Sequence, residues 1–277
     1  MGMRINTNVA SIAAQRSLKV VSRDKGITTS KMSSGERITR AADDSAGLAI
    51  SEKLKSHIRS SQQANRNAND GISYVQVAEG GLNEVQGIMT RLRELSIQSA
   101  SDTVGDSERG FINTEYQQLK QEVDRIAEVT KFNGTNLLDG KGGTLDFQVG
   151  IHNGKMTDRI SYDSAKVNAK LESLGIDGID VSSKEGAQES IESIDKAITH
   201  VSGSRSELGA LQNRLISTTN NLETSIENMA ASNSRIRDLD YATESSNVAR
   251  LNILEAAGTS VLAQANVSPQ AAIKLLN

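Results

Sequence analysis

The most regular pattern of apolar positions lies late in the chain. Between Ile191 and Ile236 one row of apolar residues recurs every seven positions, and the row beside it is half polar. The first row consists of Ile194, Val201, Leu208, Leu215, Leu222, Met229 and Ile236. A seven-residue repeat is typical of a helix that packs along a coiled-coil-like seam. The spacing therefore predicts a helix of roughly 70 Å, which is long for an ordinary globular domain.

Two further helices are predicted earlier in the chain. From about Asp44 to Ala100 apolar residues recur at three- and four-residue steps, until turn-forming residues interrupt them at 101–107. A third helix follows and is expected to end near Asn133 and Gly134. Its apolar stripe is Ile112, Tyr116, Leu119, Val123 and Ile126. Matching stripes on long helices predict a mainly α fold, an elongated helical-bundle rod.

Glycines and short alternating segments mark about residues 135–188 as the β-rich part of the chain. One expected strand covers residues 144–149 and another covers residues 156–162. Asn153 and Gly154 lie between them, and Asn-Gly is a strong signal for a tight hairpin turn. The sequence therefore predicts a small β-hairpin region added to the helical rod.

Both ends of the chain are poor in charge but keep apolar residues at helical spacing. These residues are Ile5, Val9, Ile12, Val248, Leu251, Leu254 and Val261. The apolar faces consist largely of Ala, Val and Gly, so they bury too little surface to offset the entropy cost of ordering the chain. We therefore expect coiled-coil-like terminal helices that are disordered in a lone monomer and fold when many copies pack together.

Composition removes several classes of protein. The 277 residues contain no Cys, which excludes disulfides and thiolate metal sites, and their single Pro suits long helices. A net charge of −3 provides no overall basic field for nucleic acid. No stretch approaches the roughly 20 apolar residues that membrane insertion requires. The first residues also lack the apolar run of a secretory signal peptide. A cytoplasmic location and export without a cleavable signal both remain open at this point.

No arrangement of residues suggests catalysis. The three histidines, His57, His152 and His200, are each isolated in the sequence, so no metal-binding spacing is present. No nucleophile motif occurs. The pair Asp43 and Asp44 is interpreted as a helix cap rather than as paired acids. We therefore expect no catalytic, cofactor-binding or metal-binding site, and no enzyme activity.

A series of ordered motifs occupies both ends of the chain. In the first half these are INTN at residues 5–8, SSGERI at 33–38, ADDSAGLAI at 42–50, RNANDGIS at 66–73 and RLREL at 91–95. In the second half they are ALQNRL at 210–215, SRIRDLD at 234–240 and LAQAN at 262–266. The series resembles the two terminal cores of bacterial flagellin and covers nearly the whole chain outside about residues 140–190. Without a long insertion there, the chain resembles a short form lacking the variable outer domains.

The resemblance implies a domain organisation and a function. Residues 1–42 and 240–277 would form the inner-core coiled-coil domain. Residues 43–188, with the β-rich region at about 135–188, and the helix at 189–239 would form the outer-core domain. The protein would be a structural subunit that polymerises into the bacterial flagellar filament for swimming motility and is exported unfolded by the flagellar type III system. Its location would be the secreted filament, whether bare, sheathed or periplasmic.

The resemblance also implies partners. These are other copies of the chain in a helical homopolymer, the flagellin export chaperone at the C-terminal segment, and the filament cap and hook–filament junction proteins. Arg91, Glu94, Leu95, Gln98 and Glu115 match family positions contacted by the animal Toll-like receptor for flagellin. The alternative interpretation of these five residues is a helix face used between subunits. Two other functions stay open, a hook–filament junction protein and a cytoplasmic coiled-coil adaptor.

Overall fold

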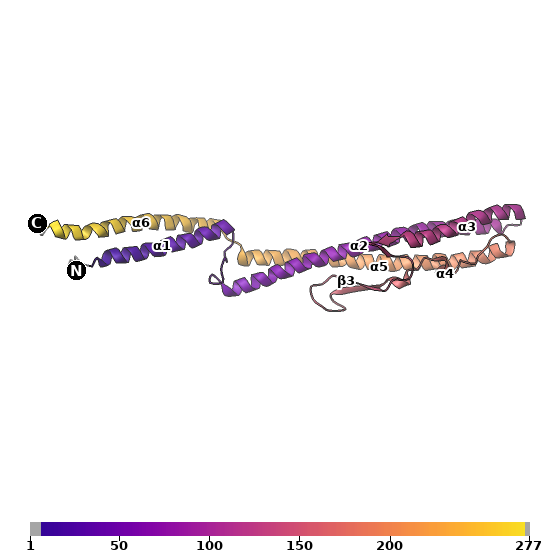
Figure 1. Ribbon diagram of the computed structural model, residues 1–277, viewed down its shortest axis with the longest axis horizontal. Helices are drawn as coiled ribbons and strands as arrows, with labels where there is room; N and C mark the ends of the chain where they lie inside the picture. Colours follow the sequence, from indigo (N-terminus) through magenta and orange to yellow (C-terminus); the bar gives the residue numbers. More distant parts are fainter. Residues whose placement is uncertain (1–6, 275–277) are drawn as a thin grey trace. The chain divides into compact units, whose positions relative to one another are not determined.

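Long helices dominate the computed structural model, which describes residues 7–274 and their side chains as far as Val267 (Figure 1). In chain order the elements are α1 (Val9–Ser34), α2 (Ser45–Ser99), α3 (Asp106–Val129), β1 (Lys131–Phe132), β2 (Thr135–Asn136), β3 (Thr144–Gln148), β4 (Arg159–Asp163), the 3-10 turn η1 (Ser164–Lys166), α4 (Leu171–Leu174), α5 (Lys184–Arg237) and α6 (Tyr241–Lys274). The strands form two small antiparallel sheets, β1–β2 and β3–β4. These elements confirm a mainly α fold with a small β-hairpin region.

Side-chain caps set the helix boundaries. The carboxylate of Asp44 accepts the backbone N–H of Gly47 at 2.8 Å and begins α2, as expected for an acid at this position. In the same way the Asn8 side chain accepts the N–H of Ser11 at 3.0 Å and begins α1. Gly35 ends α1 with a φ of 70°, a left-handed conformation that glycine adopts without strain. The predicted boundaries near residues 44 and 100 therefore agree with α2.

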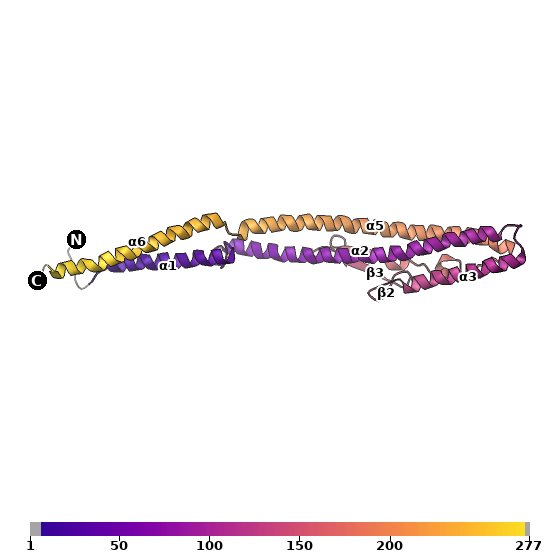
Figure 2. The same ribbon diagram turned by 90° about the horizontal axis from the view of Figure 1, so that it is seen from above.

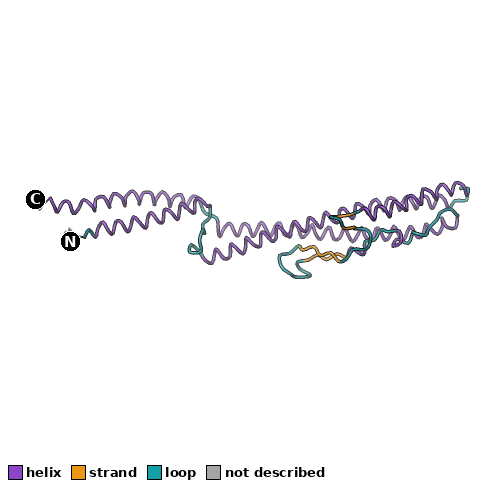
Figure 3. Tube along the Cα trace, viewed as in Figure 1, coloured by secondary structure: helices purple, strands orange, loops and turns teal. Residues whose placement is uncertain are grey.

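The described residues form two compact units, one containing the chain up to Ser56 and from Asn228 onward, the other containing His57–Glu227. In the second unit α2 and α5 run antiparallel (Figure 2). Ion pairs cross between them from Arg93 to Asp195 at 2.6 Å and from Arg205 to Glu79 at 3.7 Å. Helix α3 runs back along α2. The strands lie against this bundle of three long helices (Figure 3).

The heptad row of α5 lies in the core for part of its length. Ile194, Val201, Leu208 and Leu215 are buried and belong to the apolar cluster of the second unit. Leu222 in the same unit is half-buried, as are Met229 and Ile236 in the first unit. The difference follows from the neighbours, because α3, α4 and the β3–β4 hairpin lie along only the earlier part of α5 (Figure 1). A regular seven-residue repeat thus identifies the side of the helix that faces its neighbours, but it does not determine how completely each side chain is buried.

The end of α3 corrects the sequence-based boundary. The helix ends at Val129, four residues before the predicted end near Asn133. Asn133 and Gly134 instead form a two-residue loop between β1 and β2, with φ values of 48° and 81°. Positive φ at both positions is the requirement of a type I′ hairpin turn, which Asn-Gly meets readily. The first strand, β1, therefore begins at Lys131, before residue 135, where the β-rich region was expected to begin.

The β3–β4 hairpin is present, but its turn is not the one predicted. The last pair in the register joins Gln148 to Arg159, so ten residues, 149–158, connect the strands. Neither Asn153 nor Gly154 has the positive φ of a type I′ turn. The carboxylate of Asp158 instead accepts the N–H groups of His152 and Gly154 at 3.1 and 3.0 Å. The carboxylate of Asp158, the last residue of the loop, thus orders the loop in place of the tight turn that Asn-Gly indicated.

Tyr162 on β4 provides a test of the packing in the second unit. Its side chain is buried and its hydroxyl has no hydrogen-bond partner among the described residues. Burial raises the pKa of this phenol above its usual value. Because the desolvated hydroxyl gains no bond, Tyr162→Phe should leave the free energy of unfolding unchanged or increase it by up to about 1 kcal/mol. Chemical denaturation would measure the difference, and a loss of more than about 1 kcal/mol would show that the hydroxyl is bonded.

Candidate assembly site

The two ends of the chain pair as helices. Helices α1 and α6 run antiparallel, with the start of α1 beside the later part of α6 (Figure 1). The Asn8 amide donates to the carbonyl of Ala265 at 2.7 Å, and Lys25 pairs with Glu255 at 2.7 Å. Near the other end the Tyr241 hydroxyl donates to the carbonyl of Met32 at 3.1 Å. Polar contacts thus cross between the two helices at several points along the pair.

The interface of this helix pair contains little apolar core. Among the large apolar side chains of α1 and α6 that the structure describes, Leu251 alone is buried. Leu18, Val21 and Leu262 are only half-buried. The helices approach closely at Gly258, where a Cβ would lie only 3.0 Å from Leu18 Cδ1. Close backbone approach lets the helices touch but buries little area. The pair therefore lacks the apolar core that usually stabilises paired helices.

Most of the predicted terminal apolar residues face solvent. The exposed fractions of Val9, Ile12 and Val261 are 65%, 53% and 59%, and Leu254 is also exposed. Val248 is half-buried, Leu251 is buried, and Ile5 lies outside the described residues. Ile253 and Val267, which the helical spacing did not single out, are also exposed. An accumulation of uncovered apolar side chains on one helix pair marks an interaction surface.

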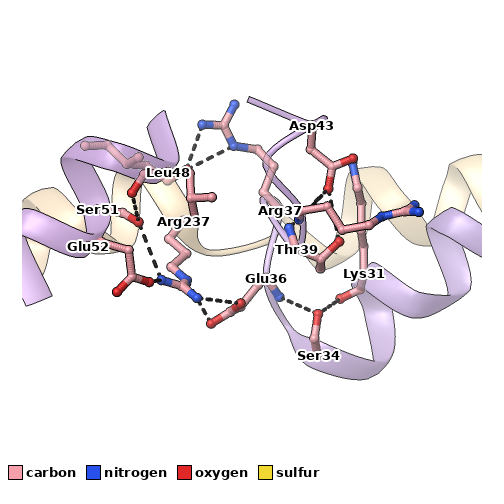
Figure 4. Close-up of polar contacts among 12 residues, drawn as sticks. Lys31, Ser34, Glu36, Arg37, Thr39, Asp43, Leu48, Ser51, Glu52 and Arg237 are labelled. Carbon is pink, nitrogen blue, oxygen red and sulfur yellow. Dashed lines mark hydrogen bonds and ion pairs between the residues drawn. The ribbon is translucent and has the colours of Figure 1, made fainter. Parts of the chain in front are cut away.

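A connector of residues 35–44 joins α1 to α2, and it pairs with the segment between α5 and α6 (Figure 4). The backbone N–H of Arg37 donates to the carbonyl of Arg237 at 2.7 Å, and the N–H of Leu239 donates to the carbonyl of Gly35 at 3.0 Å. The Arg37 guanidinium also donates to the carbonyl of Ile236 at 2.7 Å. The two chain segments that leave the terminal helices are therefore bonded to each other.

Arg237 is the central side chain of this junction. Its guanidinium is 16% exposed, lies 2.9 Å from Glu36, and also contacts Glu52 and Ser51 on α2 (Figure 4). The hydrogen bonds that Arg237 donates to Glu36 and then to Glu52 raise its pKa above the usual value. One guanidinium thus joins the connector, the start of α2 and the end of α5. Sequence reasoning missed this role, although Glu36 and Arg237 both lie in the quoted motifs.

The face proposed for receptor or subunit contact lies on α2 and α3. Arg91 pairs with Glu94 at 3.0 Å and with Glu115 at 2.9 Å, and all three side chains are about half exposed. Hydrogen bonds to Glu94 and then Glu115 raise the pKa of Arg91. Gln98 is exposed on α2. Leu95 differs from the others because it is buried in the core. The fold therefore brings three of the five residues into direct contact and places Leu95 beneath the surface.

Two histidines that are isolated in the sequence meet in the fold. The rings of His57 on α2 and His152 in the β3–β4 loop lie edge to face with centroids 6.0 Å apart. Across the described residues no three His, Cys, Asp or Glu side chains are grouped to hold a metal ion. No described helix is both long enough and apolar enough to cross a membrane.

A helical chain whose two ends pair and leave their apolar side chains uncovered has the features of a self-assembling structural subunit. Comparison with models of known protein families identifies the family of this subunit. The sequence model of the bacterial flagellin N-terminal helical region matches residues 5–142, and that of the C-terminal helical region matches residues 191–276. The chain belongs to the bacterial flagellin family. The unmatched stretch between the two regions agrees with a short form that lacks the variable outer domains.

Individual relatives match over their full length. A flagellin of Halalkalibacterium halodurans is 43% identical over 274 residues, which cover 99% of this chain and 100% of that one. A flagellar filament core protein of Brachyspira hyodysenteriae is 42% identical over 284 residues, with the same coverage. Among solved structures, Bacillus cereus flagellin aligns with a TM-score of 0.51 and 28% identity, covering 61% of this chain and 94% of that one.

The junction at Arg237 can be tested by substitution. Arg237→Met removes the cation shared by Glu36 and Glu52, which should cost about 1 kcal/mol locally because the partners are partly exposed. The backbone amides of Arg37 and Leu239 should then exchange hydrogen roughly fivefold faster. Arg235→Met is the matched control, since Arg235 is exposed and donates only to Ser232. Equal exchange in both variants would contradict a special role for Arg237.

Proposed function

We propose that this chain is a structural subunit that polymerises into a bacterial flagellar filament for swimming motility, through its paired terminal helices. The observation that carries the proposal is the uncovered apolar surface of α1 and α6, which bury only Leu251 between them among the large apolar side chains described. Other copies of the chain would cover this surface and provide the missing burial. Family membership supports the proposal, as does the relative named as a filament core protein.

The domain division proposed from the sequence follows the helix ends. Residues 1–42 and 240–277 would form the inner core of the filament, and residues 43–188 and 189–239 the outer core. The breaks at 35–44 and 238–240, where the connector and the junction lie, support boundaries near these positions. The single contiguous apolar cluster at 68–215 supports an outer core that folds by itself. The inner core, by contrast, would acquire its final stability in the polymer.

Export in an unfolded state would suit this chain. No cysteine is available to form a bridge that would hinder threading, and the terminal helix pair has few apolar contacts to break. The export chaperone would cover the apolar residues of α6 before secretion, and the filament cap and hook–filament junction proteins would contact the polymer ends.

A structural role requires no cofactor. The flagellin matches at both ends and the relatives named as flagellin and filament core protein favour this function over a junction protein or a cytoplasmic adaptor.

The exposed face of Arg91, Glu94, Gln98 and Glu115 is proposed as a contact surface between subunits and for the animal Toll-like receptor. Its support is the geometry, because ion pairs join Arg91 to Glu94 and to Glu115 and orient these three side chains. A fixed polar surface loses little side-chain entropy on binding. Leu95 would act from beneath by holding α2 in place against the core.

Assembly can be tested at one exposed position on α6. Because Val261 is 59% exposed, Val261→Asp should leave the helix content of the monomer unchanged. In the polymer the same change would bury a carboxylate against apolar neighbours and should raise the critical concentration for polymerisation at least about tenfold. Val261→Ile keeps the apolar surface and should polymerise normally. Polymerisation of Val261→Asp at the wild-type critical concentration would contradict the proposed role of the helix pair.

Receptor contact can be tested on α2. Arg91→Ala removes the cation that orients Glu94 and Glu115, and should weaken receptor signalling by about tenfold, the loss expected for one charged contact. Arg93→Ala is the control on the same helix, since Arg93 pairs instead with Asp195. A reporter-cell assay with both purified variants measures the effect. Signalling that is unchanged in Arg91→Ala, or equally reduced in both, would count against this surface.

A further inference from the structure

The β3–β4 loop, residues 149–158, is held rigidly although it lies at the surface. Besides two backbone N–H groups, the Asp158 carboxylate accepts the Thr157 hydroxyl at 2.8 Å. The Asp158 carbonyl accepts the N–H groups of Val149 and Gly150 at 2.9 Å each. A Cβ on Gly150 would lie 2.1 Å from the Asp158 carboxylate, so glycine is required there. The loop is therefore ordered before any partner binds.

This rigid loop leaves one large apolar side chain, that of Met156, in solvent. Met156 is 96% exposed, whereas Val149 in the loop and Ile160 on β4 are buried and Ile151 in the loop is half-buried. The bonds that order the loop thus do not serve to bury Met156 within its own chain. A flexible, polarisable side chain presented on a fixed loop is a common anchor in protein interfaces.

A hollow of about 440 Å³ lies beside Met156, between the loop and α5. Val149 and Ile160 contribute apolar surface to it, and Arg159 and Arg214 contribute guanidinium groups. Arg159 is fixed by a bond to the Gln148 side chain at 3.1 Å. Arg214 is exposed and forms no ion pair with any described carboxylate. The hollow thus combines an apolar surface with uncompensated positive charge.

We propose that this hollow and Met156 form a docking site for a second copy of the chain, which inserts an acidic side chain between Arg159 and Arg214. Charge complementarity supports a copy as the occupant. Glu84 on α2 and Glu185 and Glu189 on α5 are exposed carboxylates that form no ion pair within the described chain. The inference rests on the proposed polymerisation, which brings copies together, but it concerns a surface of the second unit and not the terminal helices.

The experiment uses full-length Arg214→Lys, which keeps the charge and adds a reactive amine. Filaments grown from equal amounts of unlabelled and ¹⁵N-labelled chains are treated with a carbodiimide, which condenses a lysine amine with a contacting carboxylate to an amide with loss of water. Mass spectrometry then identifies the joined peptides. The expected result is a peptide that joins position 214 of one isotope to a Glu or Asp of the other. Crosslinks at position 214 that lie only within one chain, or none, overturn the proposal.

Charge reversal provides a second readout. Arg214→Glu should raise the critical concentration for polymerisation at least about tenfold, and Met156→Gln should raise it more than Met156→Leu. Arg59→Glu is the control, since Arg59 is exposed on α2 outside the hollow. Equal effects of Arg214→Glu and Arg59→Glu overturn the docking site while leaving filament formation intact. If Arg214→Lys alone fails to polymerise with its monomer fold intact, the guanidinium itself is required, which supports the site. Failure of the wild type to polymerise overturns the proposed function as well.

Discussion

The shortage of apolar burial between α1 and α6 is the constraint on which the rest of the structure depends. Each residue ordered in a helix loses about 1–2 kcal/mol of conformational entropy, and a long helix in water needs a buried face to offset that loss. Helices of 26 and 34 residues here bury Leu251 alone among their described large apolar side chains, and they expose Val9, Ile12 and Val261. We therefore propose that other copies of the chain supply the final stability of α1 and α6, so that these two helices become fully stable only on assembly.

The second unit has the opposite balance. Its three long helices and the β3–β4 hairpin enclose one contiguous apolar cluster, so it carries its own core. The junction around Arg237 belongs to the first unit and fixes how the connector and the α5–α6 segment lie on each other. An ion pair of this kind adds little net stability, since its partners are partly exposed. Its value lies in the defined geometry it gives to the two segments from which α1 and α6 extend.

Periodicity in the sequence predicted the long helices, because apolar spacing and the lack of proline report directly on continuous helix. It did not give the depth of burial, so Leu222 and Met229 proved half-buried in the same row as Leu215, and Leu95 proved buried within an otherwise exposed face. Turn chemistry was assigned to the wrong Asn-Gly pair, since the tight turn lies at Asn133 and Gly134 and the Asp158 carboxylate orders the loop at Asn153 and Gly154. The junction at Arg237 and the contact between His57 and His152 depend on residues far apart in the chain. No local pattern indicates such meetings.

Hydrogen exchange of the α1 and α6 backbone amides, compared between monomer and filament of the same chain, tests the central claim most directly. Exchange protection reports the free energy of local opening. If copies supply the missing burial, the amides of α1 and α6 should exchange within seconds to minutes in the monomer and become strongly protected in the filament. The α5 amides near Leu208 should be protected in both states, because that residue lies in the core of the second unit. Strong protection of α1 and α6 in the monomer, or none in the filament, would contradict the account.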